Sequence, residues 1–233
     1  MIATETTMTA SGGTDGANIV LFWPANLPKD SDRRLMDDPI ELAESLREDG
    51  KLIWFLCDGD GDYSVKVFVR SPLPRELADY CTDEEAYPSL EVNGPGYFGG
   101  MEYMFKDDPS FLRKHPGMCE KITIPNGTYA AKVYRTNVPE EIYETWLLDH
   151  AGIHAKRLWD FHSTLAACSA ASVMGLVFLL FFVAWTTWFG VLIAVACLIT
   201  ATIGLSKTEA YRVVADARNA YELAYPSYVV LLE

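Results

Sequence analysis

Residues 163–206 read STLAACSAASVMGLVFLLFFVAWTTWFGVLIAVACLITATIGLS, a run of 44 residues without a charge, a histidine or a proline. One helix of this length would far exceed a hydrocarbon core of about 30 Å, whereas two spans of about 20 residues fit it. Residues 185–190, in the middle, supply interfacial aromatics and a glycine for a turn. The run therefore predicts a membrane hairpin, with residues 163–184 entering and residues 188–206 returning.

A pair of helices buried in a soluble protein is the alternative for this run. A surface helix of a soluble protein keeps a polar face toward water, and neither half of the run has one. About 18 apolar residues already favour a membrane span, and this run is more than twice as long. A signal peptide is not expected, because the run lies near the C-terminal end of the sequence.

Basic residues flank both ends of the predicted hairpin and are absent from its turn. Lys156 and Arg157 precede the first span, and Lys207, Arg212 and Arg218 follow the second. Cytoplasmic flanks of membrane spans carry an excess of Lys and Arg. Both termini and the soluble part are therefore expected on the cytoplasmic side of the inner membrane.

The charge is divided unevenly along the chain. Residues 151–233 carry five acidic and five basic side chains, so the whole net charge of −13 lies in residues 1–150. An anionic lipid surface and nucleic acid would both repel such a domain. Solubility alone explains an acidic surface, and the alternative is an acidic face for a basic protein partner.

The sequence predicts an α+β fold with a mainly antiparallel sheet and short helices, plus the two-helix transmembrane hairpin. Residues 1–17, rich in Thr and Gly, are expected to form a disordered leader. The segments that follow are a cytoplasmic α+β domain (18–150), an interfacial helix (151–162), the hairpin (163–206), and a helix and strand that return to the N-terminal domain (207–233). That last strand is residues 228–232, which would otherwise leave an unpaired edge beside the membrane.

Local signals predict several elements of the soluble domain. A helix begins at Asp38-Pro39-Ile40-Glu41, where Asp is the N-cap and Pro opens the first turn. Residues 51–57 are apolar on both faces and predict a central strand, paired with residues 63–70 across residues 58–62. Residues 121–124 and 128–136 predict a second hairpin across Pro125-Asn126-Gly127. Gly152 is expected to bend the helix that leads to the membrane.

Small residues recur at every fourth position in both predicted spans. Such residues let membrane helices approach closely. The stripe is therefore expected either to close the hairpin on itself, which we favour, or to face another protomer. It comprises Ala167, Ala171 and Gly175 on the first span and Ala196, Thr200 and Gly204 on the second.

Two clusters resemble metal sites but lack required ligands. Asp58-Gly59-Asp60-Gly61-Asp62 superficially matches a calcium loop, yet Tyr63 and Val69 stand where that loop needs Gly and Glu. A polar turn is the better interpretation. His150 and His154 share a helix face, but Ala151 replaces the glutamate of a zinc-protease motif. No metal or cofactor is therefore predicted.

The candidate for a catalytic role is a Cys–His pair. Cys119 lies four residues after His115, and such a pair could form a thiolate nucleophile, but no third orienting group is evident. A buried cysteine is the plainer interpretation. The remaining thiols, Cys57 and Cys81 in the soluble part and Cys168 and Cys197 in the spans, show no metal spacing and are expected to be reduced.

The predicted function is therefore non-catalytic binding at the membrane. An acidic cytoplasmic domain would capture or neutralise a protein partner, for example as an immunity-type inhibitor of a toxin. The candidate partner-binding residues are Asp79, Asp83, Glu84 and Glu85, although such a run is also typical of a solvated surface. The alternatives are an accessory subunit of a membrane complex, with the small-residue stripe as its contact, and an enzyme that uses Cys119 or the Asp58–Asp62 loop.

Overall fold

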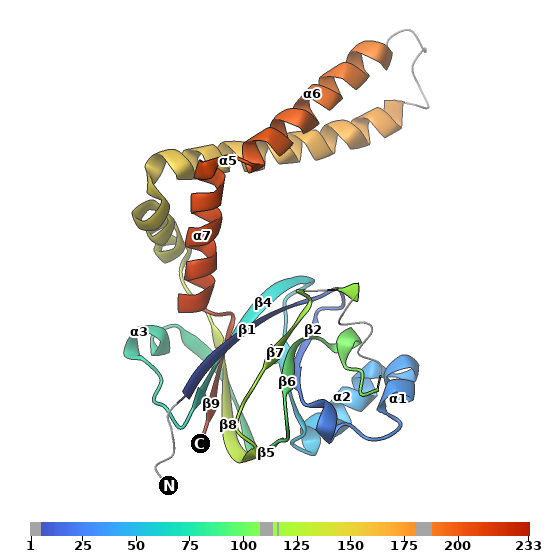
Figure 1. Ribbon diagram of the computed structural model, residues 1–233, viewed down its shortest axis with the longest axis vertical. Coiled ribbons are helices and arrows are strands. Elements are labelled where there is room, and N and C mark those ends of the chain that lie inside the picture. The colour runs from blue at the N-terminus through green and yellow to red at the C-terminus, as the bar shows by residue number, and fades with distance from the viewer. Residues whose placement is uncertain (1–5, 108–113, 116, 180–187) are drawn as a thin grey trace. The chain divides into compact units, whose positions relative to one another are not determined.

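The computed structural model describes residues 6–107, 114–115, 117–179 and 188–233 (Figure 1). Contacts divide the chain into two compact units. The sheet unit comprises residues 1–138 and 222–233, and the helical unit comprises residues 139–221.

The sheet unit has an α+β fold with a mostly antiparallel sheet, as the sequence predicted. Nine strands follow the order β3-β2-β6-β7-β1-β4-β9-β8-β5, and β4 and β9 form its parallel pair. The strands are β1 (Thr6–Thr14), β2 (Asn18–Phe22), β3 (Leu52–Leu56), β4 (Gly61–Val69), β5 (Cys81–Val92), β6 (Gly96–Gly100), β7 (Cys119–Ile122), β8 (Gly127–Thr136) and β9 (Tyr228–Leu232).

Short helices cover the outer face of this sheet. Helices α1 (Ser31–Asp37) and α2 (Pro39–Glu48) pack Leu35, Leu42 and Leu46 against the outward side chains of β2 and β3. Helix α3 (Arg75–Ala78) packs Leu77 against Phe68 and Val229. The inner face forms the largest apolar core. Every strand of the described sheet contributes to it, and β1 does so with the small residue Ala10. Single-turn helices also lie at Pro24–Asn26 and Met101–Tyr103.

The predicted start of α2 is confirmed. Asp38 is the N-cap, and its carboxylate accepts a hydrogen bond from Glu41 N at 3.0 Å. Pro39 occupies the first turn, where its missing N–H costs nothing.

The prediction of a disordered leader is wrong for residues 6–14, which form β1. This strand pairs with β4 along its whole length and also touches β7, so it lies well inside the sheet. The glycines that suggested disorder have a structural role. At Gly12, an added Cβ would lie 2.5 Å from Phe98 O, so the position needs a glycine. The glycines allow a close approach between strands rather than disorder. Residues 1–5 lie outside the described residues.

Both predicted hairpins are also wrong. Strand β3 pairs with β2 and β4 pairs with β1 and β9, so the Asp58–Asp62 turn joins strands that are not neighbours. Likewise β7 pairs with β6, whereas β8 pairs with β5 and β9. Strand β3 lies at an edge of the sheet, not at its centre. Both of its faces are apolar because one packs in the inner core and the other packs against α2.

The C-terminal strand returns to the sheet, as expected from the sequence. Strand β9 lies between β4 and β8, and Tyr228, Val229, Val230 and Leu232 are almost completely buried. A segment more than 150 residues from β4 along the chain therefore completes the N-terminal domain.

The helical unit consists of α5 (Glu140–Leu179), α6 (Trp188–Ser206) and most of α7 (Glu209–Ala224). Gly152 adopts φ 79° and breaks α5, which confirms the predicted bend. Residues 151–162, expected as an interfacial helix, are part of α5 around and beyond this break. Leu147 and Ala155 of α5 pack on Val214 and Ala217 of α7.

Helices α5 and α6 contact each other, but not through the predicted stripe. Ser169 Oγ lies 3.1 Å from Thr202 Oγ1, and His162 Nε2 lies 3.2 Å from Thr202 O. By contrast, a Cβ added at Gly175 or Gly204 would meet open space. Ala167, Ala171, Ala196 and Thr200 are likewise exposed. The prediction that this stripe closes the hairpin is therefore wrong, because the polar pair sets the contact on a neighbouring face.

Within the described residues, no single helix has the length and hydropathy needed to cross a membrane. One bent pair does meet these criteria by length and composition, namely Leu192–Ser206 followed by Glu209–Ala224 at 61°. Residues 180–187, which hold the predicted end of the first span and part of the turn, lie outside the described residues.

Candidate functional site

The two edge strands of the sheet, β3 and β5, approach each other without pairing. Glu91 N donates a hydrogen bond to Gly50 O at 2.8 Å, where β3 begins. Further along, Trp54 N donates to the Tyr87 hydroxyl at 3.3 Å. We call the region between Gly50–Leu56 and Asp83–Glu91 the seam. Side chains and one backbone hydrogen bond bridge the seam, where a regular ladder of strand hydrogen bonds would otherwise lie.

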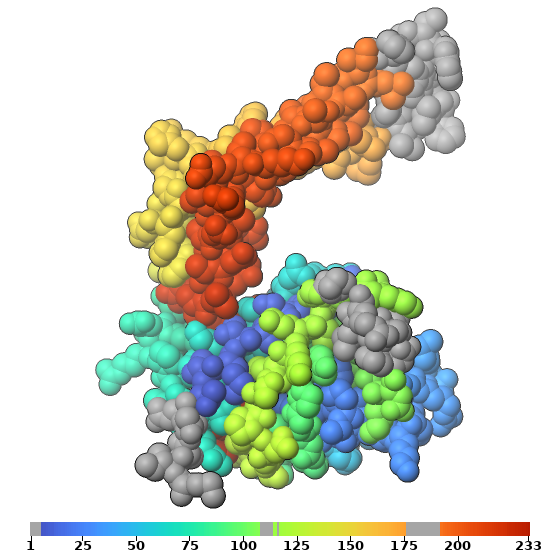
Figure 2. Space-filling view, in the orientation of Figure 1, coloured from blue at the N-terminus to red at the C-terminus, as the bar shows by residue number. Residues whose placement is uncertain are grey.

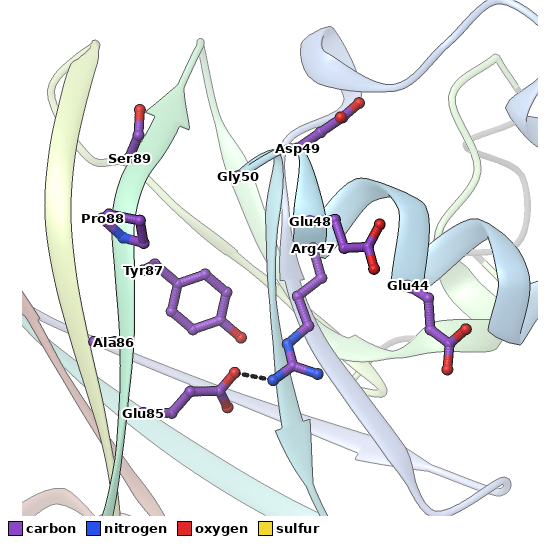
Figure 3. Close-up of a pocket in the computed structure, with 10 residues that line it drawn as sticks. All are labelled: Glu44, Arg47, Glu48, Asp49, Gly50, Glu85, Ala86, Tyr87, Pro88 and Ser89. Atoms are coloured by element: carbon purple, nitrogen blue, oxygen red, sulfur yellow. Dashed lines mark hydrogen bonds and ion pairs between the residues drawn. The ribbon is translucent and has the colours of Figure 1, made fainter.

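A polar hollow of about 610 Å³ opens on one side of the seam (Figure 3). Tyr87 and Glu85 of β5 point toward Arg47 of α2, and the Arg47 guanidinium forms an ion pair with Glu85 across the hollow. This hydrogen bond raises the pKa of Arg47. The lining residues are Glu44, Arg47, Glu48, Asp49, Gly50, Glu85, Ala86, Tyr87, Pro88 and Ser89.

A smaller hollow of about 120 Å³ lies at the other end of the seam and shares Glu85 with the first. Leu56 lies at its rim and is 77% exposed, although it is a large apolar residue. Arg135 also lines it and forms an ion pair with Asp58, which lowers the pKa of that carboxyl through hydrogen bonding. The Tyr228 hydroxyl donates to Leu56 O at 2.7 Å.

The structure separates the predicted partner-binding residues. Asp83 and Glu85 line the seam. Glu84 instead forms an ion pair with Lys132 at 3.0 Å, and the hydrogen bond lowers the pKa of Glu84. Asp79 follows α3 as its C-cap and lines neither of the two hollows. Only part of the acidic run therefore contributes to one surface.

The Tyr87 hydroxyl holds the seam together from a buried position. Its side chain is 5% exposed, and burial raises the pKa of Tyr87 to about 12. The hydroxyl therefore stays protonated at physiological pH while it accepts the Trp54 N–H.

Removing this hydroxyl with Tyr87→Phe is expected to lower the free energy of unfolding by about 1–2 kcal/mol, because Trp54 N loses its acceptor. Urea denaturation followed by tryptophan fluorescence measures the change. The folded pKa of Tyr87 lies above its ordinary value of 10.0. The contribution of the Tyr87 hydroxyl to the free energy of unfolding should therefore be complete below pH 10 and fall as the pH rises toward 12. Equal stability of the two proteins at pH 7 would contradict this role.

The two metal-like clusters acquire other roles. Asp58 forms an ion pair with Arg135. The break at Gly152 lies between His150 and His154, so they do not share one regular helix face. His150 stacks on Trp146, with ring centroids 3.9 Å apart. Among the described residues, no group of three or more His, Cys, Asp or Glu side chains is placed to hold a metal ion.

Cys119 does not have the properties of a nucleophile. Burial, followed by the nearby Glu102 charge, raises the pKa of the Cys119 thiol to about 12. An added Cβ at Gly99 would lie 2.8 Å from Cys119 Sγ, which shows how closely the strands enclose this sulfur. The His115 ring lies against Tyr103, with centroids 5.9 Å apart.

Cys119 is therefore expected to react with iodoacetamide at pH 8 at least tenfold more slowly in the folded protein than in the urea-unfolded chain, because the thiolate is the reactive form. Mass spectrometry of the alkylated peptide measures both rates. Rapid labelling in the folded state would contradict the buried role and revive the enzyme alternative.

Sequence reasoning did not identify the seam. Its residues come from α2, β3, β5, β8 and β9, and only long-range strand order brings them together. The available signal was the apolar run at residues 51–57, whose Leu56 remains exposed.

Comparisons with known proteins add little. No protein-family model matches the chain, and no curated protein shows significant similarity to it. One solved structure, described as Crocagin biosynthetic gene J, is similar at 16% sequence identity. The match covers 57% of this chain and 79% of that chain, with a TM-score of 0.36.

Proposed function

We propose that this chain is a non-catalytic, membrane-tethered binding protein. Its acidic sheet unit captures or neutralises a basic protein partner at the cytoplasmic face of the inner membrane. An immunity-type inhibitor of a toxin is one concrete form. The observation that carries the proposal is the contrast between the two units, one strongly acidic and one with uncovered apolar helices.

The proposed membrane attachment is supported by the exposed apolar side chains of α5 and α6. Figure 2 shows one face of α6, which is open along most of its described length. Met174 is 73% exposed, and Ile193 and Ile203 are each more than half exposed. Such a surface is costly in water and favourable in hydrocarbon. No single described helix meets the length and hydropathy criteria for a span, but the bent pair Leu192–Ser206 and Glu209–Ala224 does by length and composition.

The binding role rests on charge. The net charge of −13 lies outside the predicted hairpin and its flanks. Ion pairs at the seam neutralise only some of its carboxylates, because Arg47 pairs with Glu85 while Glu44, Glu48 and Asp49 line the same hollow. Complementary charge mainly speeds association and makes binding sensitive to salt.

Affinity purification of the intact protein from gently solubilised native membranes tests this function. We expect a basic protein to be retained at low salt and released by moderate salt. Reversing two seam-side charges, with Glu44→Lys and Asp83→Lys, should weaken its retention at least fivefold. The control Asp37→Lys, at an exposed residue of α1 that lines neither hollow, should not. The proposal would be contradicted if retention of the partner changed neither with salt nor with the substitutions Glu44→Lys and Asp83→Lys.

An accessory subunit of a membrane complex is the second candidate, and one observation favours it. Since Gly175 and Gly204 have open space around them, the small-residue stripe is available to another membrane protein or another protomer. In that case integral membrane proteins would co-purify despite high salt. Gly175→Leu or Thr200→Leu would then release them without affecting a basic partner.

A further inference from the structure

We propose that the seam binds an extended basic segment of the partner, which pairs with the free edge of β3 near Trp54 and Leu56. This inference rests on the proposed function and names the binding surface and the chemistry that it recognises.

The backbone of β3 provides the first argument. In the antiparallel β2–β3 pair, Trp54 lies opposite Val20, yet Trp54 N donates to Tyr87 on the far side. A strand residue directs its N–H and C=O to the same side, so the backbone groups of Leu52, Trp54 and Leu56 all face the seam. No strand of the described chain pairs with this edge. Tyrosine hydroxyls satisfy single groups there, and a strand can satisfy a continuous row.

The opposite edge is unsuited to pairing. Strand β5 has irregular register between Thr82 and Glu85 and again between Tyr87 and Leu90. Pro88 lies in the second irregularity and has no N–H to donate. Bulges and proline are common protections of an edge strand. The regular edge of β3 lacks both, so an added segment is expected to pair there.

The surroundings of the seam select a basic segment. Four acidic residues, Glu44, Glu48, Asp49 and Glu85, line the larger hollow, and Arg47 forms an ion pair with Glu85 alone among them. Lys51 pairs with Asp49 at 2.8 Å and leaves the set still negative. Lysine or arginine side chains on the added segment would reach these carboxylates, whereas acidic side chains would be repelled.

The seam also offers an apolar contact at its other end. Leu56 is largely exposed at the rim of the smaller hollow. Asp83 and Glu85 line the same hollow, so acidic groups lie beside this apolar side chain. Successive side chains of an extended segment point to opposite faces. A segment that alternates basic and apolar residues fits both contacts.

Binding of defined peptides to the intact protein in lipid nanodiscs tests this proposal. The probes are an alternating Lys-Val octapeptide, a block isomer with four Lys followed by four Val, and an alternating Glu-Val octapeptide. We expect the alternating Lys-Val peptide to bind at least tenfold more tightly than either other peptide. It should also slow amide hydrogen exchange in residues 52–57.

Two matched variants locate the site. Leu56→Arg places a positive charge in the seam and should weaken binding of the alternating Lys-Val peptide at least tenfold. Met36→Arg makes the same change at a residue of α1 that is 75% exposed and should have no effect. Equal binding of the alternating and block peptides, or no effect of Leu56→Arg, would overturn the seam proposal.

The two proposals can fail separately. If Leu56→Arg still captures the basic partner from native membranes as well as the unchanged protein does, the seam proposal is wrong and the binding function stands. If the alternating peptide binds the seam but no basic partner is captured, the seam proposal stands and the proposed function falls.

Discussion

Gly50→Ala is expected to lower the free energy of unfolding of the sheet unit by about 3 kcal/mol or more. Gly50 adopts φ +66°, a left-handed conformation that costs a non-glycine residue about 1–2 kcal/mol. In addition, an added Cβ would overlap Ser89 O, a backbone atom that cannot rotate away. The backbone of β5 would have to move, and the hydrogen bond from Glu91 N to Gly50 O would be lost with it.

Gly59→Ala is the matched control for this substitution. Gly59 lies in the turn after β3, and a Cβ there would meet no atom within 4 Å. Its stability should change by no more than about 0.5 kcal/mol. Urea unfolding of the intact protein in detergent, followed by tryptophan fluorescence, measures both variants. Equal stability of Gly50→Ala and Gly59→Ala would show that the two edges do not meet at Gly50.

Deleting residues 226–233 is expected to abolish cooperative folding of the sheet unit. The deletion removes β9, so that β4 and β8 each lose a neighbour in the middle of the sheet. It also removes four buried side chains, from Tyr228, Val229, Val230 and Leu232. At about 1.5–3 kcal/mol each, their burial rivals the total stability of about 5–15 kcal/mol typical of a domain. Loss of the sigmoidal thermal transition in circular dichroism is the expected result.

A graded variant separates this effect from the consequences of truncation. Val230→Ala should cost about 2 kcal/mol, because Val230 is completely buried and leaves a cavity. Leu223→Ala, at an exposed position of α7, should change stability by less than about 0.5 kcal/mol. An unchanged melting curve after the deletion would contradict the placement of β9.

The sequence predicted those elements whose signals are local. The Asp38 cap and Pro39 identified the start of α2 without any knowledge of the remainder of the fold. Val65, Val67 and Val69 alternate along the sequence, and all three lie in the inner core from β4. Gly152 likewise indicated the break in α5, because a glycine interrupts a helix wherever it adopts a positive φ.

Predictions failed where distant segments decide the structure. Asp-Gly and Asn-Gly turns suggested two hairpins, yet β3 and β4 pair with β2 and β1, which precede both of them in sequence. Composition suggested that residues 6–14 are disordered, whereas their glycines allow β1 to approach β6 closely. Spacing suggested that the small-residue stripe forms the helix contact, but Ser169 and Thr202 hydrogen-bond on another face. The seam depends on all of these long-range pairings.

The reactivity of the cysteines in α5 and α6 tests most directly whether these helices lie in a bilayer. Cys168 and Cys197 are both exposed on the helix surfaces. Opened native membranes are treated with a water-soluble maleimide, and labelled sites are identified by mass spectrometry. Met36→Cys, at an exposed position of the sheet unit, is the reference. We predict labelling of Met36→Cys within minutes, with Cys168 and Cys197 protected until SDS dissolves the membrane. Labelling of both cysteines as fast as the reference would contradict the account.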